Sequence, residues 1–338
     1  MAHSAPGLTR RQFIRITASA GVLLAGGLGL ANSLSSHRVE SVQVTRLLLG
    51  SIANLTIISD EPDQARAAIN AAFDRMVALE DVLSHYRPHS QLSQLNASSQ
   101  LADAHPALLE VLTSALDCSH LTGGAFDVSI EPVHRLYREY ARAGALPPED
   151  VVRKARQLVD YRQVQIDGST VRLGKTGMAL TFDGIAKGYI VDQGVAVLAE
   201  HGFGNVLVEL GGDLHTLGDT GQRPWQIAIR ESDATTESQR LVAQVRGALA
   251  TSGDYLNTFT ADRRLHHILD PHSGISPSQL ASASVLAPTT CDADALSTAL
   301  LVLGATNGLA LIDRLPGTEA LVITKHGAIH KTSGFPLA

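Results

Sequence analysis

The sequence predicts an α+β fold, in which antiparallel sheets are covered by helices. Helical and strand patterns are mixed along the chain, without the regular strand-helix alternation that a parallel sheet requires. No short-period repeat, low-complexity segment or long linker follows residue 36. Residues 37–338 are therefore predicted to form one compact unit.

The first half of the chain combines strand pairs with helices. Two apolar runs on either side of Gly50 predict a strand pair or one bent strand over residues 42–59. Pro62 begins a helix with one apolar face, and Pro88 lies just beyond its expected end. The polar residues 86–96 are predicted to form a loop. Further expected elements are helices over 106–121, 136–143 and 147–158, and a hairpin over 164–173.

The second half is predicted to contain most of the strands. The apolar run Met178-Ala179-Leu180 has the character of a strand end, and it is followed by a glycine-containing turn. Residues 190–198 show helical periodicity, closed by Gly202. Further strands are expected over 205–210, 225–230, 247–251, 265–271, 283–287, 320–324 and 328–331, and further helices over 292–303 and 307–315.

The composition is that of a soluble globular enzyme. The chain has 338 residues, of which 44% are hydrophobic and 18% charged. A formal charge of −6 without a basic stripe argues against a nucleic-acid partner. Cys118 and Cys291 form no metal-binding spacing. A single disulfide between them is arithmetically possible, but two buried thiols are the favoured interpretation.

The N-terminus predicts export. Arg10 and Arg11 precede Gln12-Phe13-Ile14, and an uncharged run follows to about Leu34. This arrangement resembles a twin-arginine signal, so residues 1–36 are predicted to be a signal peptide and the protein to be periplasmic. The alternative is an uncleaved membrane anchor, but the run is rich in Gly and Ala and close to the short limit for spanning.

A turn over residues 181–192 is the first candidate for chemistry. Glycines in a turn before a helix expose backbone amides that suit a phosphate, and Lys187 adds positive charge. Glycines at such turns serve packing in most proteins, so the signal is weak alone.

Three other features carry weak signals of their own. Asp294 and Thr298 are four residues apart, so they share one helix face and offer oxygen ligands to a hard cation. His267 and Tyr86 are candidates for a base and a stacking platform. An exposed helix edge, a core histidine and a cover over the core edge are the favoured interpretations while each feature is taken alone.

Six separated stretches taken together resemble the ApbE family of flavin transferases, the FAD:protein FMN transferases. They occur in the family's order and cover nearly all of the chain after the signal. They are residues 84–88 with 90–92 and 95–96; 122–127; 184–189 with Asp192; 210–213; 267–271 with Gly274; and 293–298.

The resemblance implies an ApbE-like (T-fold-like) unit that uses Mg²⁺ and takes FAD as its substrate. FMN would pass from FAD to a Ser or Thr hydroxyl of an acceptor electron-transfer flavoprotein near the membrane, with release of AMP. His267 would be the catalytic base. The resemblance implies Gly184, Asp294 and Thr298 as metal ligands, and Leu49, Tyr86, Ala125, Phe126, Asp127, Thr181, Lys187 and Leu269 as residues of the FAD site.

The sequence departs from the family pattern at several of these positions. The family often has methionine at Leu49, aspartate at Thr181 and glycine at Asp183, and Ser297 occupies a position that can be aspartate. A hydroxyl at position 181 can bond to FAD but carries no charge. Together with the twin-arginine signal, Thr181 resembles an exported branch of the family that includes maturation factors for respiratory reductases.

Two other functions remain open at this point. The same site could use water as the nucleophile and act as a Mg²⁺-dependent FAD pyrophosphatase, giving FMN and AMP. The chain could also be a non-catalytic FAD-binding assembly factor. The presence of Asp294, Thr298 and His267 argues against the last, because a simple binder needs neither a metal nor a base.

Overall fold

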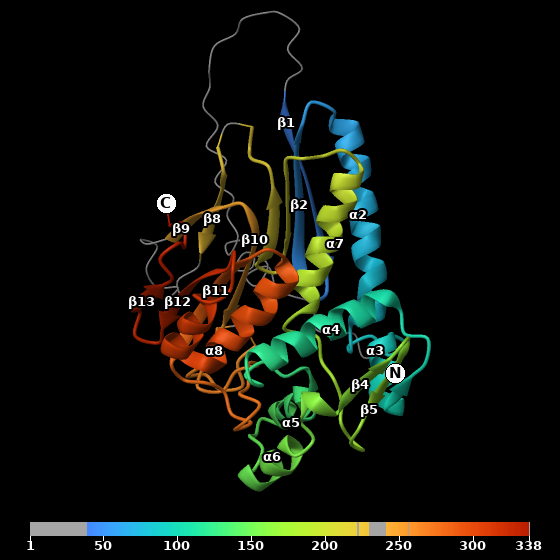
Figure 1. Ribbon diagram of the computed structural model, residues 1–338, viewed down its shortest axis with the longest axis vertical. Helices are drawn as coiled ribbons and strands as arrows, with labels where there is room; N and C mark the ends of the chain where they lie inside the picture. The colour runs from blue at the N-terminus through green and yellow to red at the C-terminus, as the bar shows by residue number, and fades with distance from the viewer. Residues whose placement is uncertain (1–38, 222, 230–240, 256, 338) are drawn as a thin grey trace, which may run out of the picture.

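The computed structural model describes residues 39–221, 223–229, 241–255 and 257–337 (Figure 1). The predicted signal peptide lies outside the described residues. The main sheet has eight strands, in the order β1-β2-β6-β7-β10-β11-β12-β13, and every neighbouring pair is antiparallel. These strands are β1 (Glu40–Leu48), β2 (Ser51–Ser59), β6 (Val206–Leu210), β7 (Asp213–Leu217), β10 (Gly247–Gly253), β11 (Leu280–Ala287), β12 (Glu319–Thr324) and β13 (Ile329–Lys331).

Helices cover one face of this sheet, and a small second sheet covers the other (Figure 1). The predicted α+β class with antiparallel sheets is therefore confirmed. The helices are α2 (Pro62–Leu83), α3 (Gln91–Ser98), α4 (Pro106–Leu121), α5 (Glu131–Arg142), α6 (Glu149–Arg156), α7 (Ala186–Glu200) and α8 (Thr290–Ile312), with short 3₁₀ turns at Val128–Ile130 and Tyr161–Gln163. The smaller sheets are β8 (Trp225–Ile229) with β9 (Leu241–Val245), and β3 (Gln100–Leu101), β5 (Thr170–Leu173) and β4 (Val164–Asp167).

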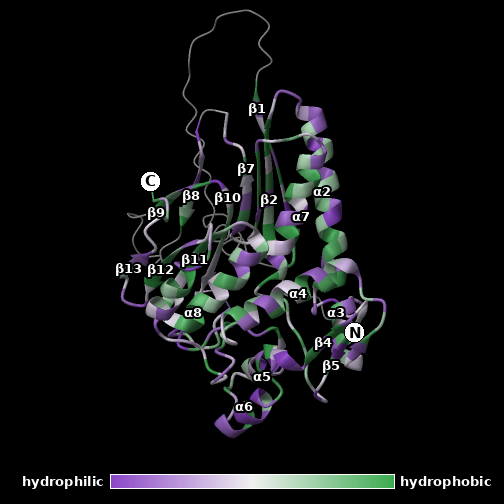
Figure 2. Cartoon of the chain, in the orientation of Figure 1, coloured by the Kyte–Doolittle hydropathy of each residue, from purple (hydrophilic) through white to green (hydrophobic). Residues whose placement is uncertain are grey.

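Burial on both faces explains why successive residues at the start of β6 are apolar. In β6, Val206 and Val208 pack under the helices, whereas Leu207 packs against the β8–β9 sheet. Side chains of a strand alternate between its two faces, so both sets must be hydrophobic when both faces are covered. The helices instead have one polar side, as the mixed colours of α2 in Figure 2 show.

The tip of the first hairpin has an unusual backbone. Leu49 and Gly50 join β1 to β2 with φ values of 50° and 68°. Two consecutive positive φ values are typical of the type I′ turn, whose twist matches that of the strands. The strand pair is thus confirmed, and Leu49 adopts a conformation that a branched side chain rarely takes.

Helix α8 unites the two helices predicted for the last part of the chain. Gly304 (φ 75°, ψ 175°) interrupts it, which is why the sequence pattern indicated two segments. Among the described residues, α8 alone is long and apolar enough to cross a bilayer. More than half of its most apolar window is buried against the sheet and neighbouring helices, as expected for a core helix.

Three local predictions are wrong. Residues 178–180 form no strand, because the backbone of Leu180 exchanges both of its hydrogen bonds with the side-chain amide of Asn96, at 2.7 and 2.8 Å. Residues 265–271 form bends, with only an isolated bridge from His266 to Thr258. The expected loop over 86–96 contains the start of α3, which Ser90 caps by accepting from the Ser93 amide.

Candidate active site

The glycine-containing turn that begins at Thr181 places the start of α7 in direct contact with α8. A Cβ built at Gly184 would lie 3.0 Å from the Thr298 hydroxyl oxygen, and one at Gly188 would overlap the Thr290 carbonyl. A side chain at Gly188 would therefore force the two helices apart. The contact between turn and helix that the resemblance implied is present.

Asp294 lies where the two helices meet. It is 3% exposed, and its Oδ2 accepts a hydrogen bond from the Gly188 amide at 3.1 Å. That amide belongs to the first turn of α7, where backbone N–H groups lack partners within the helix and favour negative charge. Burial raises the pKa of Asp294 to about 7, although the charge of Lys187 acts in the opposite direction. Additional positive charge beside this carboxylate would favour its ionised form.

Lys187 is paired with a second buried carboxylate. Its ammonium group forms an ion pair and hydrogen bond with Asp213, the first residue of β7, which is 1% exposed. Burial disfavours the charge on Lys187, but Asp213 and Asp294 outweigh it and raise the lysine pKa. Sequence reasoning expected Lys187 to meet FAD and did not predict its pairing with Asp213. The signal was available in the Gly-Gly-Asp that follows the buried strand β6.

Hydroxyl groups surround Thr298. The Ser252 hydroxyl lies 3.1 Å from that of Thr298 and 2.8 Å from that of Ser297. Ser297 also donates to the backbone carbonyl of Asp294 at 2.9 Å. Ser297, one of the departures from the family pattern, is thus satisfied within the fold. Ser252 was missed as a site residue, and its position in a polar Ser-Gly-Asp-Tyr run that begins within β10 was the available signal.

These groups offer oxygen donors only. A cation here could use the Gly184 carbonyl, the Asp294 carboxylate and the Thr298 hydroxyl, because the contacts above bring the segments of all three residues together. Within residues 39–337, apart from the gaps given above, no group of three or more His, Cys, Asp or Glu side chains is arranged to hold a metal ion. The donor set differs from those of transition-metal sites, which rely on nitrogen and sulfur.

Tyr86 and Asp183 form an exposed part of the site. Tyr86 is 64% exposed, and its hydroxyl donates to Asp183 Oδ2 at 3.0 Å. The His85 ring lies against Tyr86 with centroids 3.9 Å apart, and its Nδ1 is 3.5 Å from Asp183 Oδ1. Thr181, which is buried, accepts a hydrogen bond from the Asp183 amide at 3.1 Å. Two of the residues expected at the FAD site, Tyr86 and Thr181, are therefore linked through Asp183 and His85.

His267 belongs to the same charged region. Its backbone amide donates to the Asn257 carbonyl at 3.1 Å, and its side chain is half-buried. Burial lowers the pKa of His134 to about 3; Asp183 acts against this shift, whereas Arg138 and His267 reinforce it. His134 is thus held neutral among charged neighbours, and His267 lies close enough to contribute to that effect.

The Asp127 carboxylate accepts hydrogen bonds from neighbouring groups of the protein. Its Oδ1 accepts from the amide and hydroxyl of Ser129 at 2.8 and 2.6 Å, and its Oδ2 accepts from the Tyr161 amide at 3.1 Å. It therefore caps the 3₁₀ turn and fixes the segment that carries Phe126. The role as a polar anchor for FAD, expected from the resemblance, is not visible in these contacts.

The other expected FAD residues are divided between the site and the core. Phe126 contacts the turn, with its ring carbon 3.3 Å from a Cβ built at Gly184, and Ala125 is buried beside it. Leu269 packs in a separate apolar cluster under α5 and α6. Leu49 lies at the β1–β2 tip, next to Ser51, which the backbone of Gly211 approaches closely.

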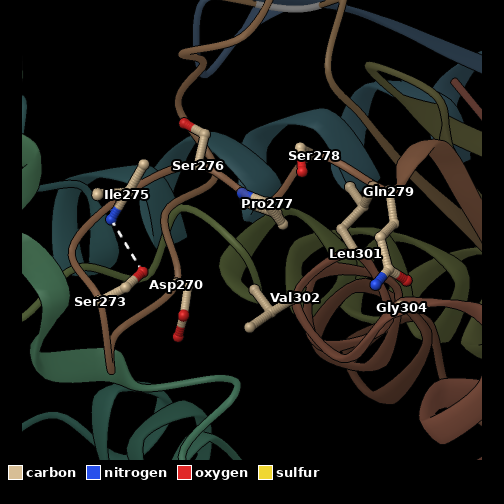
Figure 3. A pocket seen from close by; sticks show the side chains of 10 residues that line it. All are labelled: Asp270, Ser273, Ile275, Ser276, Pro277, Ser278, Gln279, Leu301, Val302 and Gly304. Carbon is tan, nitrogen blue, oxygen red and sulfur yellow. Dashed lines mark hydrogen bonds between the residues drawn. The ribbon is translucent and has the colours of Figure 1, made fainter.

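A cavity of about 360 Å³ is lined in part by α8 (Figure 3). It lies between α8 and the loop that follows His267, and its nearest α8 residue, Leu301, is less than one turn beyond Thr298. In Figure 3 the Gln279 side chain lies against the kink at Gly304, where a Cβ would overlap it. The lining residues are Asp270, Ser273, Ile275, Ser276, Pro277, Ser278, Gln279, Leu301, Val302 and Gly304.

Comparison with known proteins identifies the family. The sequence model of the ApbE family matches residues 49–322, from the hairpin tip to strand β12. The chain belongs to the ApbE family. Its matched region includes the Gly184 turn, Asp294, Thr298, Tyr86 and His267.

Individual ApbE relatives match over most of their length. The chain is 32% identical over 336 residues to the FAD:protein FMN transferase of Treponema pallidum, and the match covers 93% of both chains. The solved flavin transferase ApbE from Vibrio cholerae superimposes with a TM-score of 0.77 at 26% identity, covering 88% of this chain and 99% of that one. The crystal structure of the ApbE protein from Thermotoga maritima gives 0.78 at 26% identity, covering 87% and 97%.

Proposed function

We propose that the chain is a FAD:protein FMN transferase, which moves FMN from FAD to a Ser or Thr hydroxyl of an acceptor flavoprotein and releases AMP. The names of its relatives support this activity. The observation that carries the proposal is the meeting of the Gly184 turn with the Asp294–Thr298 face of α8, beside Lys187. A positive charge and oxygen donors for a cation come together there, and both suit a diphosphate.

The oxygen donors fit Mg²⁺. Magnesium is usually held by one or two carboxylates together with phosphate oxygens and water. Asp294, Thr298 and the Gly184 carbonyl supply such a set, and the raised pKa of buried Asp294 indicates a carboxylate that a cation would stabilise. When bound, Mg²⁺ offsets the negative charge that develops on the phosphoryl oxygens.

The chain's own residues position and deprotonate the reactants. The acceptor oxygen attacks the FMN-side phosphorus, the bond from that phosphorus to the bridging oxygen breaks, and AMP leaves with this oxygen. His267 accepts the hydroxyl proton at an imidazole nitrogen. Tyr86 stacks on the flavin ring, and Lys187 faces the diphosphate while Asp213 holds it in place.

Incubation with FAD, Mg²⁺ and a threonine-containing acceptor domain tests the proposal. Mass spectrometry should show an acceptor heavier by one FMN less one water, the increment of a phosphoester. FMN and AMP appearing free in solution would instead indicate a pyrophosphatase that uses water, and unchanged FAD would indicate a binding or assembly factor. An acceptor with its attachment threonine changed to alanine is the matched control.

We further propose that the protein acts in the periplasm, close to a membrane-bound or exported acceptor. The support is the Arg10-Arg11 pair with its apolar run. The double change Arg10→Lys and Arg11→Lys should retain the protein in the cytoplasm, as measured by cell fractionation. Periplasmic accumulation of that variant would contradict twin-arginine export.

A further inference from the structure

We propose that Asp183 positions Tyr86 for stacking on the flavin ring and thereby sets the affinity of the site for FAD. The inference rests on the proposed function, because that function assigns Tyr86 to the flavin. Asp183 is one of the departures from the family pattern, and no ligand or catalytic role has been assigned to it above.

Asp183 fixes the outer end of Tyr86. An exposed tyrosine has two free side-chain torsions, and ordering them on ligand binding costs free energy. The hydrogen bond from the Tyr86 hydroxyl to Asp183 Oδ2, at 3.0 Å, restricts the ring before any ligand arrives. Because Tyr86 remains 64% exposed, this restraint does not cover its accessible surface.

His85 completes the support. Its ring contacts Tyr86 at a centroid distance of 3.9 Å, while its Nδ1 lies 3.5 Å from Asp183 Oδ1 and 3.3 Å from the Thr181 hydroxyl. One carboxylate thus holds the tip of Tyr86 and the ring behind it. The two oxygens of Asp183 contact different partners, so a change to this residue alters both supports of Tyr86 together.

Asp183 also links the two halves of the proposed FAD site. The flavin half is the part around Tyr86, and the diphosphate half is the part around Gly184, Lys187 and Asp294. Asp183 directly precedes Gly184, whose place is determined by the close approach to Thr298. The Asp183 amide donates to Thr181 at 3.1 Å, which restricts the backbone that carries the carboxylate. The distance between the stacking ring and the phosphate-binding turn is therefore set by two consecutive residues.

The test compares Asp183→Ala and Asp183→Asn in the full chain. FAD binding is followed by the quenching of flavin fluorescence, which stacking on tyrosine produces, and KM for FAD is measured separately from kcat. Asp183→Ala should weaken FAD binding about 10-fold and reduce the quenching. Asp183→Asn should lose about 3-fold, because an amide oxygen still accepts from Tyr86.

A double-mutant cycle with Tyr86→Phe separates positioning from a general effect on the fold. If Asp183 acts through the Tyr86 hydroxyl, most of its effect on FAD binding should disappear in the Tyr86→Phe background. Asp74→Ala, which changes an exposed carboxylate on α2 only 4.0 Å from Arg46, is the control and should bind FAD normally.

Three outcomes would overturn the inference: wild-type quenching in Asp183→Ala, independent effects of the two changes in the cycle, or an Asn variant as weak as the Ala variant. Failure of the proposed function would look different. FAD would then bind with Asp183-dependent quenching, but no FMN would reach the acceptor.

Discussion

The two halves of the candidate site differ in how deeply their charged and polar side chains are buried. In the half proposed to bind the diphosphate, Asp294 and Asp213 are 3% and 1% exposed and lie beside Lys187 and the start of α7. In the flavin half, Tyr86 is 64% exposed and the side chain of Asp183 is 38% exposed. Water can replace a partner lost from an exposed pair, but a buried charge left without its partner is costly. The first half should therefore tolerate almost no change, whereas the second adjusts affinity.

The largest effect is expected at Asp294. Asp294→Ala should lower Mg²⁺-dependent FMN transfer by more than about 100-fold, because it removes the carboxylate of the donor set and leaves the α7 N-terminus uncompensated. Transfer rates measured over a magnesium titration test this. Asp292→Asn, an exposed position on the same helix, is the control and should behave as wild type. Full activity of Asp294→Ala would remove the metal assignment.

His267 should separate chemistry from binding. His267→Ala is expected to retain FAD binding and to lose transfer by about 10²- to 10⁴-fold, since a general base contributes to proton removal and not to ligand affinity. Fluorescence titration and acceptor mass spectrometry measure the two properties independently. His326→Ala, at an exposed turn, serves as the control. A variant that no longer binds FAD would make His267 a pocket residue.

The contact between the helices should respond through stability. Gly188→Ala places a methyl group onto the Thr290 carbonyl in the buried half and should destabilise the protein by about 3 kcal/mol. Urea unfolding measures this. Gly204→Ala is the matched control, because no atom lies within 4 Å of a Cβ built there, and its effect should stay within about 0.5 kcal/mol. Equal stability of the two variants would show that α7 can move away from α8 without cost.

Sequence patterns predicted the regular elements well because periodicity reports burial on one face. Helices α2, α4 and α7 and the antiparallel strands follow from such patterns. The segment ending at Leu180 was predicted wrongly because an apolar run indicates burial but not its hydrogen-bond partner, which is the Asn96 side chain. Helix α3 is short, and only two of its residues, Leu92 and Leu95, are buried.

The site was predicted by family resemblance more than by physics. Spacing placed Asp294 and Thr298 on one helix face, which the structure confirms. The partnership of Lys187 with Asp213 and the approach of Ser252 to Thr298 join residues 26 and 46 positions apart. No local pattern encodes such contacts, because they depend on how the strands of the main sheet are ordered.

The smallest effect is expected at Thr181, where the two halves meet. Its side chain is buried, yet its hydroxyl accepts from the amide of the exposed Asp183 at 3.1 Å. Thr181→Val keeps the shape but leaves that amide without its partner, so we expect a loss of about 1 kcal/mol in unfolding free energy. FAD affinity should fall about 2- to 5-fold as the Asp183 backbone loosens.

Thr181→Ser is the control for this last change, because it keeps the hydroxyl and should keep FAD affinity within about 2-fold. The comparison also addresses the charge that the family often has at this position. If Thr181→Val binds FAD as tightly as wild type, position 181 neither contacts FAD nor holds Asp183, and the flavin half depends on Tyr86 and His85 alone. If Thr181→Val loses affinity as severely as Asp183→Ala, the Thr181 hydroxyl itself contacts FAD.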